Sequence, residues 1–167
     1  MTNSTISQLA ASLSAEHLAL QNFLSLLEKE QSLLVANLTQ DVLELSSKKI
    51  SDAIQLDQLA ESRRNLMHTM IVSSGRNASS TPLTQEEIFA WLEKHCGNAI
   101  PVWRKIRILA ERAQQLNLVN GELIRMKMRH NQQALAALSQ AADKANLYGP
   151  DGQHNFSSGG GRSLGSV

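Results

Sequence analysis

Residues 4–35 read STISQLAASLSAEHLALQNFLSLLEKEQSLLV and carry an apolar side chain at every seventh position. One line of this seam consists of Ile6, Leu13, Leu20, Leu27 and Leu34. The second line consists of Ala10, His17, Leu24, Gln31 and Leu38. A heptad pattern kept over several repeats predicts a coiled-coil-like helix, about 50 Å long at a rise of about 1.5 Å per residue. The face is widened by further apolar residues, so a third helix is expected to pack there: Leu9, Leu18, Phe23 and Leu33.

A second long helix is predicted to run from Asp41 to the polar stretch Ser73-Ser74-Gly75. Asp41 and Glu44 have the spacing of a capping box at its start. Its inward face is expected to consist of Val42, Leu45, Lys49, Leu56, Leu59, Leu66, Met70 and Ile71. The short loop at residues 37–40 makes this helix an antiparallel neighbour of the first.

Two more helices are predicted after a polar loop at residues 76–82. Thr84 and Glu87 form a second capping box, which begins a short helix that ends by Gly97 and carries Ile88, Phe89, Trp91 and Leu92. Pro101 suits the first turn of the last, long helix. The seam of that helix consists of Val102, Ile106, Leu109, Ala113, Leu116, Leu123, Leu135, Leu138 and Ala141. Asn120 falls on the same seam, where a buried Asn selects register and pairing partner.

Composition agrees with an all-α fold, because hydrophobic residues make up 42% of the chain and aromatic residues only 4%. We predict a long antiparallel helical hairpin plus a third long helix, a short connecting helix and a disordered C-terminal tail. The Gly149-Pro150 pair ends the last helix. The expected division is a helical bundle domain at residues 1–146 and a flexible tail at 147–167. A single Cys, no signal peptide and no apolar membrane span lead us to expect a cytoplasmic protein without membrane insertion.

Motifs for catalysis, cofactors or metals are absent from the sequence, so we predict a protein that is not an enzyme and needs no cofactor. Its histidines are scattered: His17, His68, His95, His130 and His154. His95 and Cys96 are adjacent, but neighbouring helix residues point about 100° apart and cannot easily share a hydrogen bond.

A basic stretch on the last helix leaves one alternative open, a helical protein that binds nucleic acid. The stretch consists of Arg104, Lys105, Arg107, Arg112, Arg125, Lys127 and Arg129, against Glu111 and Glu122. Such residues could follow a phosphate backbone. No aromatic residues are interleaved and no nucleic-acid module is present, so a solvated face is the favoured interpretation and no nucleic-acid partner is predicted.

The most distinctive motifs stand near the end of the chain. They are Asn131-Gln132-Gln133-Ala134-Leu135, then Leu147-Tyr148-Gly149-Pro150-Asp151-Gly152-Gln153, and then a Gly- and Ser-rich segment with Arg162. Weaker matches upstream are Trp103, Asn117-x-x-Asn120-Gly121, Asp41, Lys49 and Arg63. With these motifs the chain resembles the FlgN family, the flagellar type III export chaperones of the hook-associated junction proteins. It departs from the family pattern at residues 75–101, where the connector is longer than expected.

The resemblance implies a cytosolic protein that binds the C-terminal helical segments of the hook-associated junction proteins, its cargo. It would prevent their premature assembly and deliver them to the cytosolic domain of the export gate protein, with accessory proteins of the export ATPase as further partners. The implied cargo-binding residues are Asn131, Ala134, Leu135, Leu138, Ala141, Ala142, Ala145 and Leu147. Tyr148 is implied to dock on the export gate. The apolar stripe among these residues has the spacing with which an amphipathic helix binds a partner helix.

Overall fold

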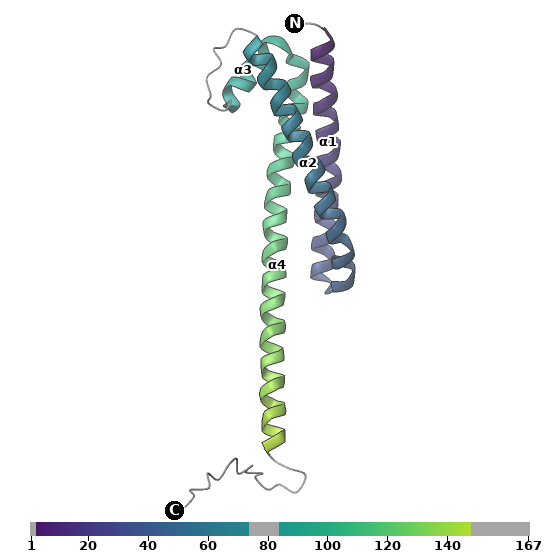
Figure 1. The fold of residues 1–167 in the computed structure, drawn as a ribbon, viewed down its shortest axis with the longest axis vertical. Helices are drawn as coiled ribbons and strands as arrows, with labels where there is room; N and C mark the ends of the chain where they lie inside the picture. The colour runs from purple at the N-terminus through teal and green to yellow at the C-terminus, as the bar shows by residue number, and fades with distance from the viewer. Residues whose placement is uncertain (1–2, 74–83, 148–167) are drawn as a thin grey trace, which may run out of the picture. The chain divides into compact units, whose positions relative to one another are not determined.

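The computed structural model describes residues 3–73 and 84–147, and within them every regular element is helical (Figure 1). The elements are α1 (Asn3–Val35), α2 (Thr39–Ser73), α3 (Gln85–His95), the 3-10 turn η1 (Gly97–Ala99) and α4 (Ile100–Leu147). This confirms the predicted all-α class. The chain divides into two compact units, Met1–Leu123 and Ile124–Val167. The predicted tail at residues 147–167 lies, beyond Leu147, outside the described residues.

A tight turn joins α1 and α2 into the predicted hairpin. Asn37 has a φ of 60°, in the left-handed region that Asn tolerates better than most residues. α2 begins at Thr39, so Asp41 lies inside its first turn and the expected cap at Asp41 is wrong. The Asp41 carboxylate still lies at the positive end of the helix dipole, where a negative charge is favourable.

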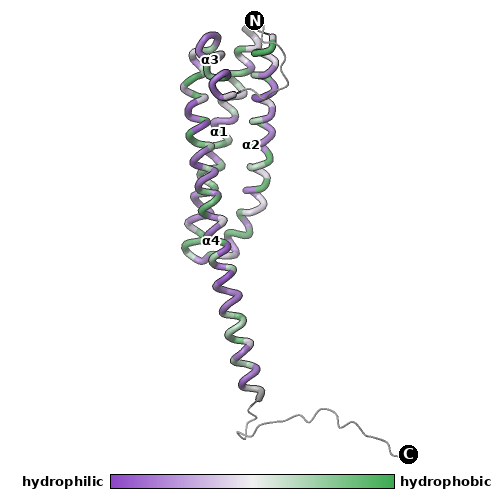
Figure 2. Tube along the Cα trace, turned by 90° about the vertical axis from the view of Figure 1, so that its left-hand side faces the viewer, coloured by the Kyte–Doolittle hydropathy of each residue, from purple (hydrophilic) through white to green (hydrophobic). Residues whose placement is uncertain are grey.

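The first line of the predicted seam of α1 lies largely in the core of the first unit, whereas in the second line only Leu24 is buried, and Ala10 and Leu38 are exposed. Leu13, Leu20, Leu27 and Leu34 are all buried. Figure 2 shows hydrophobic and hydrophilic residues alternating along α1, as an amphipathic helix requires. The larger of two clusters joins four elements: Leu9, Leu13, Leu20, Met67, Met70, Ile71, Ile88, Trp91, Leu92, Cys96, Trp103 and Ile106. Leu18 is the exception to the widened face, since 59% of its surface is exposed.

α3 begins as the sequence predicted. The Glu87 backbone N–H donates to Thr84 Oγ1 at 3.3 Å, and the Thr84 N–H donates to Glu87 Oε2 at 2.8 Å. This capping box satisfies two backbone donors that a helix start would leave unpaired. Its apolar face then contributes Ile88, Trp91 and Leu92 to the core.

The first part of α4 packs against α1. Pro101 is the second residue of α4, where its missing N–H costs no helical hydrogen bond. A second, smaller core cluster joins Leu24 and Leu27 of α1 to Ala113 of α4. None of the helices in residues 3–73 and 84–147 has an apolar stretch long enough to cross a bilayer.

Candidate functional site

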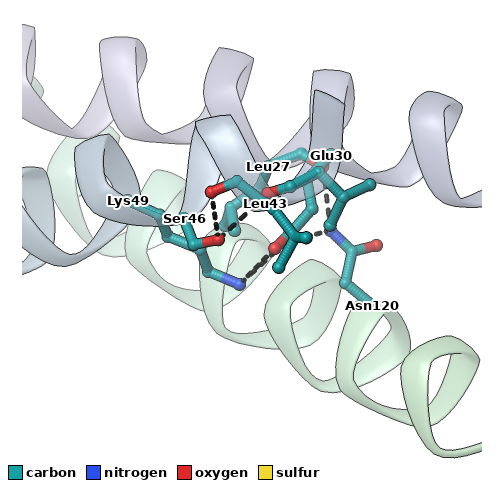
Figure 3. A network of polar contacts seen from close by, with 7 residues as sticks. Leu27, Glu30, Leu43, Ser46, Lys49 and Asn120 are labelled. Carbon is teal, nitrogen blue, oxygen red and sulfur yellow. Dashed lines mark hydrogen bonds and ion pairs between the residues drawn. The ribbon is translucent and has the colours of Figure 1, made fainter. Parts of the chain in front are cut away.

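A buried polar network joins α1, α2 and α4 in the first unit (Figure 3). Asn120 of α4 has no exposed surface and Glu30 of α1 only 4%. Asn120 Nδ2 donates to the Leu27 carbonyl at 2.9 Å and to Glu30 Oε2 at 2.8 Å. The Lys49 ammonium of α2 donates to both oxygens of the same carboxylate, at 2.8 and 2.9 Å. The predicted seam position of Asn120 is therefore confirmed, and its amide is held by the partner helix.

A second polar contact lies two heptads away on each helix of the hairpin. Arg63 of α2 donates to the buried Glu16 carboxylate of α1. The Arg63 guanidinium also lies 4.6 Å from the centre of the Trp103 ring of α4, a cation–π distance. We call these two sets of polar contacts the two polar layers. Each layer combines a carboxylate from α1, a cationic side chain from α2 and a further side chain from α4.

These two layers define how the three helices align. A slip of the hairpin by one turn would separate both ion pairs at once and leave Glu16 and Glu30 buried without partners, which is strongly unfavourable. The sequence pattern places Lys49 on the inward face of α2, but it did not predict that Glu16 and Glu30 are buried. A signal was present, because Glu16 and Glu30 are two heptads apart beside the apolar seam, and Lys49 and Arg63 repeat the same interval.

The second unit presents a different surface. Every side chain from Asn131 to Lys144 is exposed. Leu135 and Leu138 have 66% and 67% of their surface exposed, and Met128 has 56%. Residues spaced alternately by three and four share one helix face, and we call this set the α4 stripe: Met128, Asn131, Leu135, Leu138 and Ala142.

The α4 stripe contains four of the eight residues that the family resemblance implied for cargo binding: Asn131, Leu135, Leu138 and Ala142. Ala134 and Ala141 flank it on one side and are also exposed. Ala145 and Leu147 belong to the last turn of α4, and Tyr148 lies outside the described residues. Small side chains beside two leucines allow another helix to approach closely, so the arrangement suits helix-to-helix binding.

Within residues 3–73 and 84–147, no group of three or more His, Cys, Asp or Glu side chains is placed so that it could hold a metal ion. Burial raises the pKa of the Cys96 thiol, which disfavours the nucleophilic thiolate. The His95 ring packs edge-on against Trp91, with the ring centres 5.1 Å apart. His95 and Cys96 are thus part of the packing around α3.

The basic stretch of α4 is partly engaged within the protein. Arg112 pairs with Glu28 of α1 at 2.7 Å, and Arg107 pairs with Glu111 at 3.7 Å. The Arg104 guanidinium lies 5.3 Å from the centre of the Phe89 ring. Two of these contacts join α4 to other helices, and the Arg107–Glu111 pair lies within α4.

Comparison with known proteins finds similarity to one family. A family model described as "FlgN protein" matches residues 1–155. Two curated proteins, both called "Flagella synthesis protein FlgN", are similar over 63 residues at 43% identity; one is from Yersinia enterocolitica and one from its serotype O:8 / biotype 1B strain. Each alignment covers 38% of this chain and 42% of the relative, so the chain spans less than half the length of the curated relatives it matches. No solved structure matches the chain.

Proposed function

Because the chain belongs to the FlgN family, we propose that it is a flagellar export chaperone for the hook-associated junction proteins. In this proposal the α4 stripe binds a C-terminal helical segment of the cargo, and the chaperone delivers that cargo to the export gate. The role is one of binding and handover, with no catalytic step.

One observation carries the proposal: an apolar heptad line remains exposed along the second unit. An isolated surface leucine is ordinary, but Leu135 and Leu138 lie on one face with Met128, and all three are about half exposed or more. A helical cargo segment with the same spacing could cover this line. While it is covered, the cargo segment is unavailable for assembly into the filament junction.

The first unit has a supporting role in the proposal. Its Glu16–Arg63 and Glu30–Lys49 pairs align the hairpin with the first part of α4. This alignment provides a folded base from which α4 continues to Leu147. Tyr148 follows directly in sequence, and we propose it as the residue that docks on the cytosolic domain of the export gate. A Tyr ring supplies a large contact area at a low cost in side-chain entropy.

The test is capture of hook-associated subunits by the full chain and by a Leu135→Asp, Leu138→Asp variant. A carboxylate at either position would be buried beside apolar cargo, so affinity is expected to fall by at least about 100-fold. The helical circular dichroism should stay unchanged, since both side chains are exposed in the free protein.

Leu118→Asp is the matched control, because Leu118 is also an exposed leucine of α4, at 62%, but it lies in the first unit. It should leave capture unchanged. Equal capture by all three proteins would show that cargo binds elsewhere.

Tyr148→Ala tests the second step, delivery to the export gate. Cargo affinity should persist in this variant, while binding to the gate domain and export should decrease. Normal export by that variant would remove Tyr148 from the proposal.

A further inference from the structure

The sequence contains a single Asn-Gly pair, Asn120-Gly121, and this pair lies inside α4. In a flexible chain such a pair deamidates spontaneously, because the backbone nitrogen of Gly can attack the Cγ atom of Asn without hindrance from a Cβ. The new bond between this nitrogen and Cγ closes a succinimide ring, and the side-chain nitrogen leaves as ammonia. Water then opens the ring to aspartate or isoaspartate. The chemistry requires no enzyme and no cofactor.

The packing of α4 against α1 opposes this reaction. Asn120 has no exposed surface, and its Nδ2 donates to the Leu27 carbonyl at 2.9 Å and to Glu30 Oε2 at 2.8 Å (Figure 3). The leaving nitrogen is therefore held in place, and water has no access to it. Among the described residues no group donates to Asn120 Oδ1, so negative charge that develops on this oxygen during the attack is not stabilised.

The helical backbone is a second obstacle. Ring closure requires a ψ angle at Asn120 far from the helical value of about −42°. The N–H of Gly121 lies inside α4, where it is directed to the carbonyl four residues earlier. The attacking nitrogen can reach Cγ only after the helix opens locally, and such an opening separates Asn120 from α1.

We propose that Asn120-Gly121 is a site of spontaneous deamidation that is masked while α4 is packed against α1 and reacts when this packing opens. The inference concerns the first unit and is independent of cargo binding. The substrate is the chain itself, and water is the only other reactant. The site therefore records how long the α1–α4 contact has been open.

The product cannot restore the original packing. An aspartate at position 120 presents acceptors where the Leu27 carbonyl and the Glu30 carboxylate require donors. It also places a second buried carboxylate beside the one that already binds the Lys49 ammonium, and a buried charge without its own partner is strongly unfavourable. Isoaspartate adds a methylene group to the main chain and interrupts the helix. Deamidation thus turns a reversible opening into a permanent one.

The experiment follows deamidation of the full chain at neutral pH, with and without guanidinium chloride. The tryptic peptide of residues 113–125 contains Asn120 together with Asn117, which precedes Leu118 and is the internal control. Mass spectrometry of this peptide measures the rate at each asparagine. Asn120 should react at least about 100-fold more slowly in the native chain than in the denatured chain, because core segments open rarely. Asn117 should react slowly in both.

Matched variants test the masking. Leu27→Ala removes a buried side chain that packs against Ala113 of α4, and it should accelerate native deamidation at least about 10-fold. Leu135→Ala, at an exposed position of the second unit, should leave the rate unchanged. Guanidinium concentrations below the unfolding transition test the same point without a substitution, since the rate should rise as the open state becomes more populated.

Two further variants test the chemistry and its consequence. Gly121→Ala adds a Cβ that has no neighbour within 4 Å in the fold, yet this Cβ hinders the attack and should slow the reaction of the denatured chain at least about 10-fold. Asn120→Asp reproduces one product, and its urea midpoint should lie below that of Asn120→Ala because it buries a carboxylate.

Three results would overturn the proposal. Equal rates at Asn120 in the native and denatured chains would show that the packing does not mask the site. A native rate that neither Leu27→Ala nor dilute guanidinium increases would show that opening of the α1–α4 contact does not control the reaction. An Asn120→Asp variant as stable as Asn120→Ala would show that the product is compatible with the packed state.

Discussion

The two parts of α4 share an amphipathic spacing of apolar residues, but one part is packed and the other is exposed. Up to Asn120 its inward residues are buried: Trp103, Ile106, Ala113 and Asn120. From Asn131 onward every described side chain is exposed, although Leu135 and Leu138 continue a pattern of three- and four-residue spacing. The difference shows that amphipathic spacing determines which residues share a helix face. Whether that face is buried depends on a second helix that packs against it.

The asparagines make the comparison most direct. Asn120 is fully buried and donates to a carbonyl and a carboxylate of α1. Asn131 is exposed on the same helix. In the proposed function, the first part of α4 packs permanently within the protein and the second part binds a cargo helix that is later released. Equivalent substitutions should therefore change the stability of the fold in the first part and the affinity for cargo in the second part.

The largest difference is expected between two leucine truncations. Leu27→Ala removes a fully buried side chain that packs against Ala113 of α4 and should lower the free energy of unfolding by about 3 kcal/mol. Leu135→Ala should change it by less than about 0.5 kcal/mol, because that side chain is exposed. Urea unfolding followed by circular dichroism measures both. A comparable loss in Leu135→Ala would mean that the α4 stripe is covered within the free protein.

The two asparagines should differ by less. Asn120→Ala removes two buried hydrogen bonds, one of them to a carboxylate, and should lower the free energy of unfolding by about 2 kcal/mol. Asn131→Ala should be neutral or stabilising by a few tenths of a kcal/mol, since Ala is the better helix former. Cargo capture should show the reverse order, with the larger loss in Asn131→Ala. Similar stability losses at the two positions would contradict the contrast between the two parts of α4.

The smallest effect is expected at Gly121, next to Asn120 within α4. A Cβ added there has no neighbour within 4 Å, and Gly inside a helix costs stability relative to Ala. Gly121→Ala should therefore raise the free energy of unfolding by about 0.5–1 kcal/mol. Thermal unfolding measures this gain. Cargo affinity should stay unchanged, because Gly121 lies in the first, packed part of α4. Lower cargo affinity in the stabilised variant would indicate that binding needs a flexible backbone at this point.

Much of the fold could be predicted because helix signals are local. The Thr84–Glu87 capping box and Pro101 in the first turn of α4 depend on neighbours within a single turn, and both predictions are confirmed. The start of α2 was misplaced, because Asp41 suits the first turn of a helix as well as the cap itself. The family resemblance, based on motifs near Asn131 and Tyr148, is confirmed by a family model over residues 1–155.

The sequence by itself determined the helices, their heptad faces and the family, since these depend on side chains a few residues apart. Only the tertiary structure decided which positions on a predicted helix face are buried against another helix. Leu18 and Leu27 belong to the same predicted face, yet one is 59% exposed and the other fully buried. It also decided that Glu16 meets Arg63 and Glu30 meets Lys49. The physical reason is that burial and ion pairing require a second helix in a particular register, and residues distant in sequence set that register together.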